Sequence, residues 1–145
     1  SHVVWHTRST LKSDTNQLSD KSFILLVDVT GELAAWWGLA TVAFVGGSLD
    51  GLRGGQNMLE PAAYGAAVCF GPYTRNFRTE ASELLKAEAA VVVHDGTELM
   101  EFVAQCLNDP AYARKIGADA QKLIEKKQGG TTLTALRILD FLPVI

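Results

Sequence analysis

The sequence predicts an α/β fold, a doubly wound parallel sheet that ends in a helical C-terminal tail. Short apolar runs suit strands covered on both faces, and they alternate with segments that carry apolar residues at helical spacing. Polar or glycine-rich stretches separate these elements. Such an alternation is typical of parallel sheets with helices on both faces. We expect residues 1–145 to form one domain, because a chain of this length can bury its own core.

The first part of the chain is expected to supply two strands and one helix. Residues 3–7 (VVWHT) have the character of a short strand, and the polar residues 8–21 have that of a loop. The apolar run 22–29 (SFILLVDV) predicts a strand buried on both faces. Residues 30–40 (TGELAAWWGLA) predict a helix with Thr30 as its N-cap.

The middle of the chain repeats the order of strand and helix. Residues 41–47 (TVAFVGG) predict a strand, and a glycine-rich loop follows it. A helix is expected over 57–65 (NMLEPAAYG), where Gly65 takes the position after the C-cap that glycine favours. Residues 66–71 (AAVCFG) predict the next buried strand, and the loop PYTRNF follows.

Helices dominate the last part of the chain. Asp109 followed by Pro110 predicts a helix start, because aspartate is a good N-cap and proline suits the first helical position. The expected elements are a helix over 76–88, a strand over 89–95, a helix over 97–107, a helix from Pro110 to the glycines at 129–130, and a last helix through Leu133, Leu136 and Leu139.

Composition excludes several classes of function. The formal net charge of −3 argues against nucleic-acid binding, which requires a basic face. Cys69 and Cys106 lie in apolar runs, which predicts buried, reduced thiols in a cytosolic protein. There is no CxxC or Cys/His spacing for a metal, so we expect none. The longest apolar stretch, 34–47, is too short to span a bilayer, so any membrane association would be peripheral.

Three loops are expected at the carboxyl edge of the sheet, where open α/β folds bind ligands. They are residues 30–33, 46–57 and 71–76. Free N–H groups at helix N-termini attract phosphate, and the glycines of 46–57 would let the backbone approach a phosphorylated ligand. A simple turn is the alternative. The dinucleotide and P-loop patterns GxGxxG and GxxxxGK[ST] are absent.

A possible capping pair and three arginines near these loops each have two interpretations. Asn57 and Glu60 fit a capping box, with Asn57 at the N-cap and Glu60 reaching back, but Glu60 also suits the hydroxyls of a ribose. Arg53, Arg75 and Arg78 suit a phosphate or a sugar carboxylate, or they are solvated surface charges.

Three linked stretches resemble one known family. LLVDVTGEL, VAFVGGSLDGLRGGQNMLEPAAYGAAVCFGP and GPYTRNF together resemble the C-terminal half of the Kdo transferases. These bacterial enzymes move Kdo (3-deoxy-D-manno-octulosonic acid) from CMP-Kdo onto lipid A precursors. The resemblance covers most of residues 22–85 and continues weakly through the helical tail. It implies a Rossmann-like C-terminal domain of a GT-B glycosyltransferase, whose N-terminal acceptor domain is absent from this chain.

The resemblance also implies a donor pocket built from the three loops. Its implied residues are Gly31, Glu32 and Leu33 near the cytosine, Gly46, Gly47 and Asn57 facing the phosphate and the sugar, Glu60 on the ribose, and Gly71, Pro72, Thr74 and Asn76 lining the rest.

This sequence departs from the family pattern at several of these positions. Residues 50–53 (DGLR) stand where the family has a Val–Pro–His segment, Gln56 replaces a histidine and Met58 a proline. Tyr73 and Arg75 replace histidine and phenylalanine. We expect the pocket to persist and the sugar half of the donor to be recognised differently.

The function implied by the resemblance is metal-independent glycosyl transfer with CMP as the leaving group. The acceptor would be a lipid A precursor at the cytoplasmic face of the bacterial inner membrane. Transfer needs a general base at the acceptor hydroxyl and charge stabilisation at the leaving phosphate. The family's base and acceptor surface lie in the N-terminal domain, so we expect no catalytic residue in this chain and no turnover by it alone.

Two alternatives stay open at this point. One is the donor domain of another GT-B glycosyltransferase, or of a nucleotide-sugar epimerase, that uses a UDP- or ADP-sugar. The other is a stand-alone nucleotide-binding domain with no catalytic partner.

Overall fold

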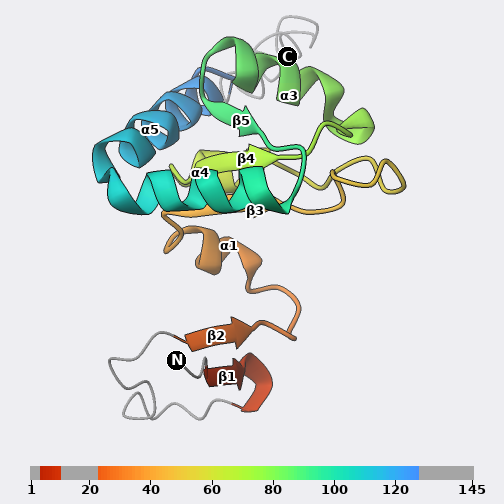
Figure 1. Cartoon of the computed structure of the whole chain (residues 1–145), viewed down its shortest axis with the longest axis vertical. Helices are drawn as coiled ribbons and strands as arrows, with labels where there is room; N and C mark the ends of the chain where they lie inside the picture. Colours follow the sequence, from red (N-terminus) through yellow and green to blue (C-terminus); the bar gives the residue numbers. More distant parts are fainter. Residues whose placement is uncertain (1–3, 11–22, 128–145) are drawn as a thin grey trace, which may run out of the picture. The chain divides into compact units, whose positions relative to one another are not determined.

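The computed structural model describes residues 4–10 and 23–127, which form two compact units (Figure 1). The first unit covers Ser1–Leu33 and the second covers Ala34–Ile145. The helix expected through Leu133, Leu136 and Leu139 lies outside the described residues, as does most of the loop expected over 8–21. The α/β class is confirmed, with parallel strands in both units. The prediction of one domain stays a prediction.

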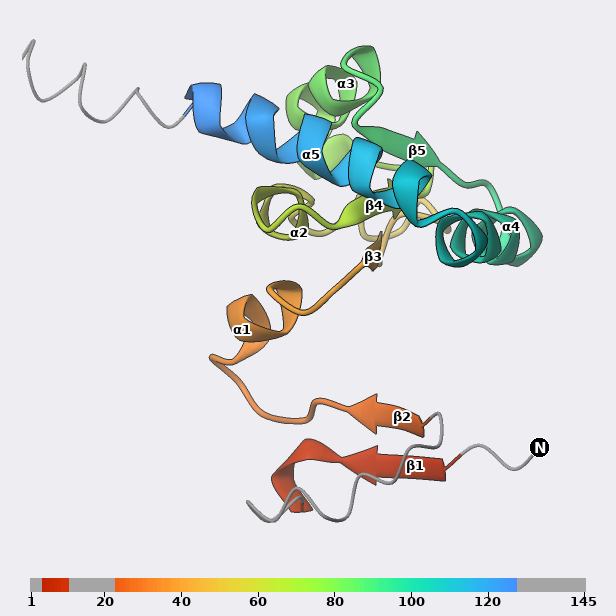
Figure 2. The same ribbon diagram turned by 90° about the vertical axis from the view of Figure 1, so that its left-hand side faces the viewer.

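The first unit contains a small parallel sheet. Strand β1 (Val4–Thr7) pairs with β2 (Phe23–Leu26), from Val4 opposite Phe23 to Thr7 opposite Leu26. Figure 2 shows the two strands side by side and pointing the same way. A short 3-10 helix, η1 (Arg8–Thr10), follows β1. Both strands lie inside the predicted ranges.

The expected burial of the 22–29 strand on both faces is not found. Phe23, Ile24 and Leu26 are exposed, and among the described strands β2 is paired with β1 alone. The described strands therefore form a two-stranded and a three-stranded sheet, where the sequence predicted one sheet.

Helix α1 (Leu33–Trp37) is much shorter than the predicted helix over 30–40. Gly31 has a φ of +88°, which a right-handed helix cannot contain. The helix therefore begins after this residue, and the prediction of Thr30 as its N-cap is wrong.

The second unit is built on three parallel strands, β3 (Val42–Val45), β4 (Ala67–Phe70) and β5 (Ala90–Val92), in the order β3-β4-β5. All four residues of the central strand β4 are buried. The helical elements are α2 (Leu59–Ala63), η3 (Arg75–Phe77), α3 (Arg78–Lys86), α4 (Gly96–Asn108) and α5 (Pro110–Lys127). Helices α2 to α5 coincide with predicted helices to within a few residues, whereas η3 begins inside the loop expected at residues 71–76.

Aspartate caps fix where the last two described helices begin. Asp95 accepts hydrogen bonds from the backbone N–H groups of Thr97 and Glu98 at the start of α4. The predicted cap of α5 is confirmed, since the Asp109 carboxylate accepts from the N–H groups of Ala111 and Tyr112. These bonds satisfy amides that have no partner inside the helix.

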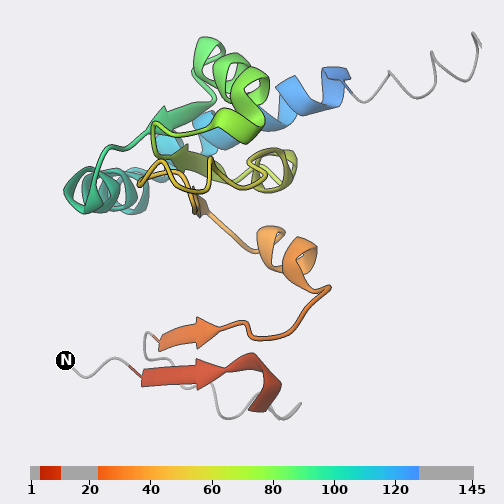
Figure 3. The ribbon, with the colours of Figure 1, turned by 90° about the vertical axis from the view of Figure 1, so that its right-hand side faces the viewer.

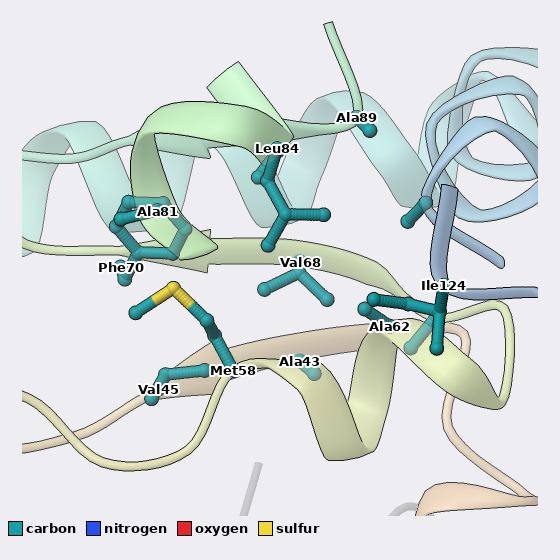
Figure 4. Packing of buried hydrophobic residues seen from close by; sticks show 13 residues of the cluster. Ala43, Val45, Met58, Ala62, Val68, Phe70, Ala81, Leu84, Ala89 and Ile124 are labelled. Carbon is teal, nitrogen blue, oxygen red and sulfur yellow. The ribbon is translucent and has the colours of Figure 1, made fainter. Parts of the chain in front are cut away.

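Helices cover both faces of this sheet, as a doubly wound arrangement requires. Successive residues of β4 point to opposite faces, so Val68 and Phe70 enter one core cluster and Ala67 and Cys69 enter the other. Figure 4 shows the first cluster, in which Leu84 of α3 points toward Val68. Figures 2 and 3 show α2 and α4 on opposite sides of the sheet, with α5 running across both.

Helix α5 approaches the turn after α2 unusually closely at Gly117. A Cβ added at Gly117 would lie 1.9 Å from the backbone oxygen of Gly65. Gly65 itself has a φ of +78° and follows the C-cap Tyr64, as the sequence predicted. The contact is backbone against backbone, so no side chain can move to make room.

We expect Gly117→Ala to lower the free energy of unfolding by about 2 kcal/mol or more, because overpacking a close contact outweighs the better helix propensity of alanine. Urea denaturation followed by circular dichroism measures this. Gly96→Ala, also at a helical glycine, is the control, because nothing lies within 4 Å of its added Cβ. Equal midpoints for the two variants would contradict the packing argument.

The reactivity of the two cysteines can test the packing of the second core cluster, to which both belong. Burial raises the pKa of the Cys69 thiol from 9.0 to about 12, with the nearby Cys106 adding to the shift. Burial also raises the pKa of Cys106. Since the thiolate is the reactive form, we expect neither thiol to react with a disulfide reagent at pH 8 in the folded protein and both to react in urea. A fast-reacting thiol in the native state would count against this packing.

Candidate functional site

The loops after β3 and β4 are joined at the carboxyl edge of the sheet; we call residues 46–57 and 71–77 the paired loops. The hydroxyl of the buried Ser48 donates to the Val45 carbonyl at 2.6 Å and accepts from the Gly71 N–H at 2.8 Å. The Ser48 carbonyl accepts from the Tyr73 N–H at 3.0 Å. The prediction that these two loops meet is therefore confirmed.

The second loop also satisfies the carbonyls of the first. Asn76 donates its side-chain amide to the carbonyls of Arg53 and Gly55, at 2.8 and 3.2 Å. Its backbone N–H donates to Gly54 at 3.0 Å, and Arg75 donates to the Leu52 carbonyl at 2.7 Å. Asn76, a predicted site residue, thus has a structural role in tying the loops together.

The glycines of the first loop serve two different purposes. Gly54 and Gly55 are buried with φ values of +81° and +83°, and a Cβ at Gly54 would lie 2.4 Å from Cγ of Arg75. The neighbouring loop requires glycine at position 54, and the positive φ favours it at position 55. Gly46 has no positive φ and nothing within 4 Å of an added Cβ. Neither strain nor packing demands glycine there. A glycine that serves the close approach of a ligand to the backbone would have these two properties.

Gly47 and Gly71 are explained by the fold. Gly47 has a φ of +69°, and its carbonyl accepts from the Gly55 N–H at 2.8 Å. A Cβ at Gly71 would lie 2.2 Å from the Ser48 carbonyl oxygen, so the paired loops leave no space for any side chain. The packing and backbone geometry of the paired loops alone account for glycine at both positions, and their place in a donor site stays a prediction.

The start of α2 differs from the predicted capping box. The hydrogen-bonded helix begins at Leu59, and Met58 before it already has helical dihedrals. The Asn57 side chain accepts from the Leu59 N–H at 3.0 Å, so Asn57 caps the helix as predicted. The second bond of the box differs, because Glu60 accepts from the Asn57 side-chain amide at 3.0 Å, where a capping box would use the Asn57 backbone N–H. Glu60 is exposed, and its role at a ribose stays a prediction.

A pocket of about 360 Å³ opens beside the paired loops. Two predicted site residues, Pro72 and Thr74, lie in its wall. The other residues that line it are Gly51, Tyr73, Arg75 and Arg78.

The remaining predicted residues, Gly31, Glu32 and Leu33, belong to the first unit. Both oxygens of the Glu32 carboxylate accept from the Arg8 guanidinium, each at 2.9 Å, in a paired arrangement. Gly31 and Leu33 are exposed. That these three residues join the paired loops in one donor site stays a prediction.

The sequence analysis did not identify three side chains that form contacts in or near the candidate site. Arg8 lies 24 residues from Glu32, so no local spacing relates them. Asp28 accepts from the hydroxyl and the N–H of Ser9, and these hydrogen bonds lower the pKa of Asp28. Ser48 could have been recognised in the sequence as a small polar residue between a buried strand and a glycine-rich loop.

Within residues 4–10 and 23–127 no cluster of three or more His, Cys, Asp or Glu residues is placed to hold a metal ion. The expected metal independence stays a prediction. In the same part of the chain, no helix is long and apolar enough to cross a membrane.

Known proteins resemble this chain in both sequence and structure, although no protein-family model matches it. A 3-deoxy-D-manno-octulosonic acid transferase of Bordetella pertussis is 34% identical over 119 residues, which is 82% of this chain and 28% of the relative. The C-terminal CMP-Kdo binding domain of WaaA from Acinetobacter baumannii has a TM-score of 0.75 at 31% identity, and the match covers 84% of this chain and 61% of that chain. The chain is a relative of the Kdo transferases. It spans less than a third of the length of the curated transferases it matches.

A further relative has a different name. A bifunctional glycosyltransferase/methyltransferase of Fusobacterium nucleatum is 34% identical over 96 residues, which is 66% of this chain and 15% of the relative. The match to the WaaA domain shows that this chain shares its fold.

The two explanations of glycine in the first paired loop predict different stabilities. We expect Gly54→Ala to lower the free energy of unfolding by about 1–3 kcal/mol, because alanine at positive φ is strained and its Cβ meets Arg75. Gly46→Ala should stay within about 0.5 kcal/mol of the parent chain. Urea denaturation of both variants measures the difference, and a large loss for Gly46→Ala would mean that the fold itself requires that glycine.

Proposed function

We propose that this chain is the donor-binding domain of a Kdo transferase, and that it holds CMP-Kdo at the paired loops. The observation that carries the proposal is the structural match to a CMP-Kdo binding domain. The open space above Gly46 supports it, because a ligand that approaches the backbone explains a glycine that the fold does not need.

The reaction we propose for the whole protein transfers Kdo to a hydroxyl of a lipid A precursor. The bond between the anomeric carbon and the CMP phosphate oxygen breaks, a bond from the acceptor oxygen forms, and CMP leaves with the electron pair. The acceptor proton goes to a general base, which we place in a preceding domain outside this chain. The role left for this chain is to hold CMP and stabilise the charge that develops on its phosphate.

The proposal extends to surroundings and cofactors. We propose that the whole protein works without a metal ion and associates peripherally with the cytoplasmic face of the bacterial inner membrane, where its lipid acceptor is present.

A nucleotide titration tests the donor assignment. We expect CMP to shift NMR resonances of Gly46 and its neighbours with an affinity about tenfold above that for UDP or ADP. Gly46→Ala should weaken CMP binding about tenfold without a loss of stability, and Glu60→Ala should weaken it if the carboxylate holds the ribose. Gly96→Ala is the control. Preference for UDP or ADP would favour another glycosyltransferase or an epimerase, and no binding of any nucleotide would contradict the proposal.

An activity assay tests whether this chain needs a preceding domain for Kdo transfer. We expect no Kdo transfer from CMP-Kdo to a lipid A precursor by the purified chain, because the proposal places the base and the acceptor surface in a preceding domain. Detectable turnover by this chain alone would refute that expectation.

A further inference from the structure

The outer side of helix α4 carries an exposed apolar stripe. Met100 and Leu107 are each 65% exposed, Ala104 is exposed and Val103 is half-buried. These four residues follow the helical spacing i, i+3, i+4 and i+7, so they share one side of the helix. The opposite side of α4 packs into the second core cluster. Single exposed apolar residues are ordinary, but a whole stripe of them at helical spacing is typical of a surface that binds another helix.

The stripe has the same pattern in both chain directions. Met100 and Leu107 are equally far from its centre, which lies between Val103 and Ala104. Two antiparallel copies of α4 that share this centre therefore place Met100 of each copy opposite Leu107 of the other. The smaller Val103 and Ala104 then meet in the middle and let the helices approach. A contact between two identical chains around a two-fold axis requires a self-complementary surface of this kind.

The charges of α4 favour the antiparallel direction. Its first half contains the carboxylates Glu98 and Glu101, its second half, residues 102–108, is uncharged, and the helix contains no basic residue. Antiparallel pairing lays the acidic half of one copy beside the uncharged half of the other. Parallel pairing would lay the acidic halves side by side and align the two helix dipoles, and both effects are unfavourable.

Helix α5 adds a complementary positive charge. Arg114 is exposed in the second turn of α5, which follows α4 after the single residue Asp109. In the part of the chain that the structure describes, neither Arg114 nor Glu101 takes part in an ion pair, whereas Lys115 is paired with Asp119. Antiparallel pairing brings the start of α5 of one copy toward the acidic half of α4 of the other. Arg114 and Glu101 thus have opposite charges at two symmetric places of the contact.

We propose that the apolar stripe of α4 binds the same stripe of a second copy of this chain, in an antiparallel pair whose direction is fixed by Glu101 and Arg114. One helix side per copy buries less than the roughly 1,200 Å² that specific, stable complexes need. The pair is therefore a weak dimer whose population rises with protein concentration.

Sedimentation equilibrium of the 145-residue chain, over a range of concentrations, measures the association. We expect a dimer with a dissociation constant of about 100 μM. Met100→Glu should weaken it about tenfold or more, because the contact would bury a carboxylate against apolar side chains. Leu39→Glu is the matched control, since Leu39 is a 79% exposed leucine of the second unit that lies outside α4. Circular dichroism checks that both variants fold.

A charge exchange tests the direction of the pair. Glu101→Arg alone and Arg114→Glu alone should each weaken the dimer about threefold, because each places like charges together across the contact. The two substitutions combined should restore the parent affinity, because the opposite charges then meet again. Failure of the double variant to recover would overturn the antiparallel arrangement.

The remaining outcomes decide whether a second copy occupies the stripe. A chain that stays monomeric at the highest concentration, or a dimer that Leu39→Glu weakens as much as Met100→Glu does, would overturn the proposal. A monomer whose free energy of unfolding falls in Met100→Glu would assign the stripe to another segment of the same chain.

Discussion

The hydrogen bonds of one buried hydroxyl hold the carboxyl edge of the sheet together. Ser48 accepts from the Gly71 N–H and donates to the Val45 carbonyl, so the ends of two neighbouring strands share one side chain. A buried hydroxyl without partners is costly, but here both its donor and an acceptor position are used. The positions of both paired loops, and of the pocket beside them, follow from this contact.

Much of the fold could be predicted because its signals are local. Among the described residues, apolar runs predicted β2 to β5, the segment VVWHT predicted β1, and the aspartate before Pro110 predicted the start of α5. The predictions failed where a conformation is set by a single backbone angle or by distant partners. The positive φ of Gly31 shortens α1, and nothing in the apolar pattern of residues 22–29 reveals how the strands divide into two sheets.

The site was predicted in outline and misinterpreted in part. The sequence located the loops and offered two explanations for the glycines of 46–57, close approach of a ligand or a simple turn, whereas Gly54 is required by the second loop and Gly55 by its positive φ. Composition cannot distinguish a glycine packed against its own chain from one facing open space. The partners of Asn76 and Glu32 lie more than 20 residues away in sequence, so their contacts could not be read from spacing.

The contact between Gly117 and Gly65 also fixes the register of α5. A shift of this 18-residue helix by one position would bring Ile116 or Ala118 over the Gly65 carbonyl, where even a single Cβ would lie 1.9 Å from an oxygen. The helix therefore cannot slide along the sheet or rotate on it by one residue. Substitutions at these two positions should be coupled across relatives that keep this packing, since a side chain at 117 requires a different path of the turn at 65.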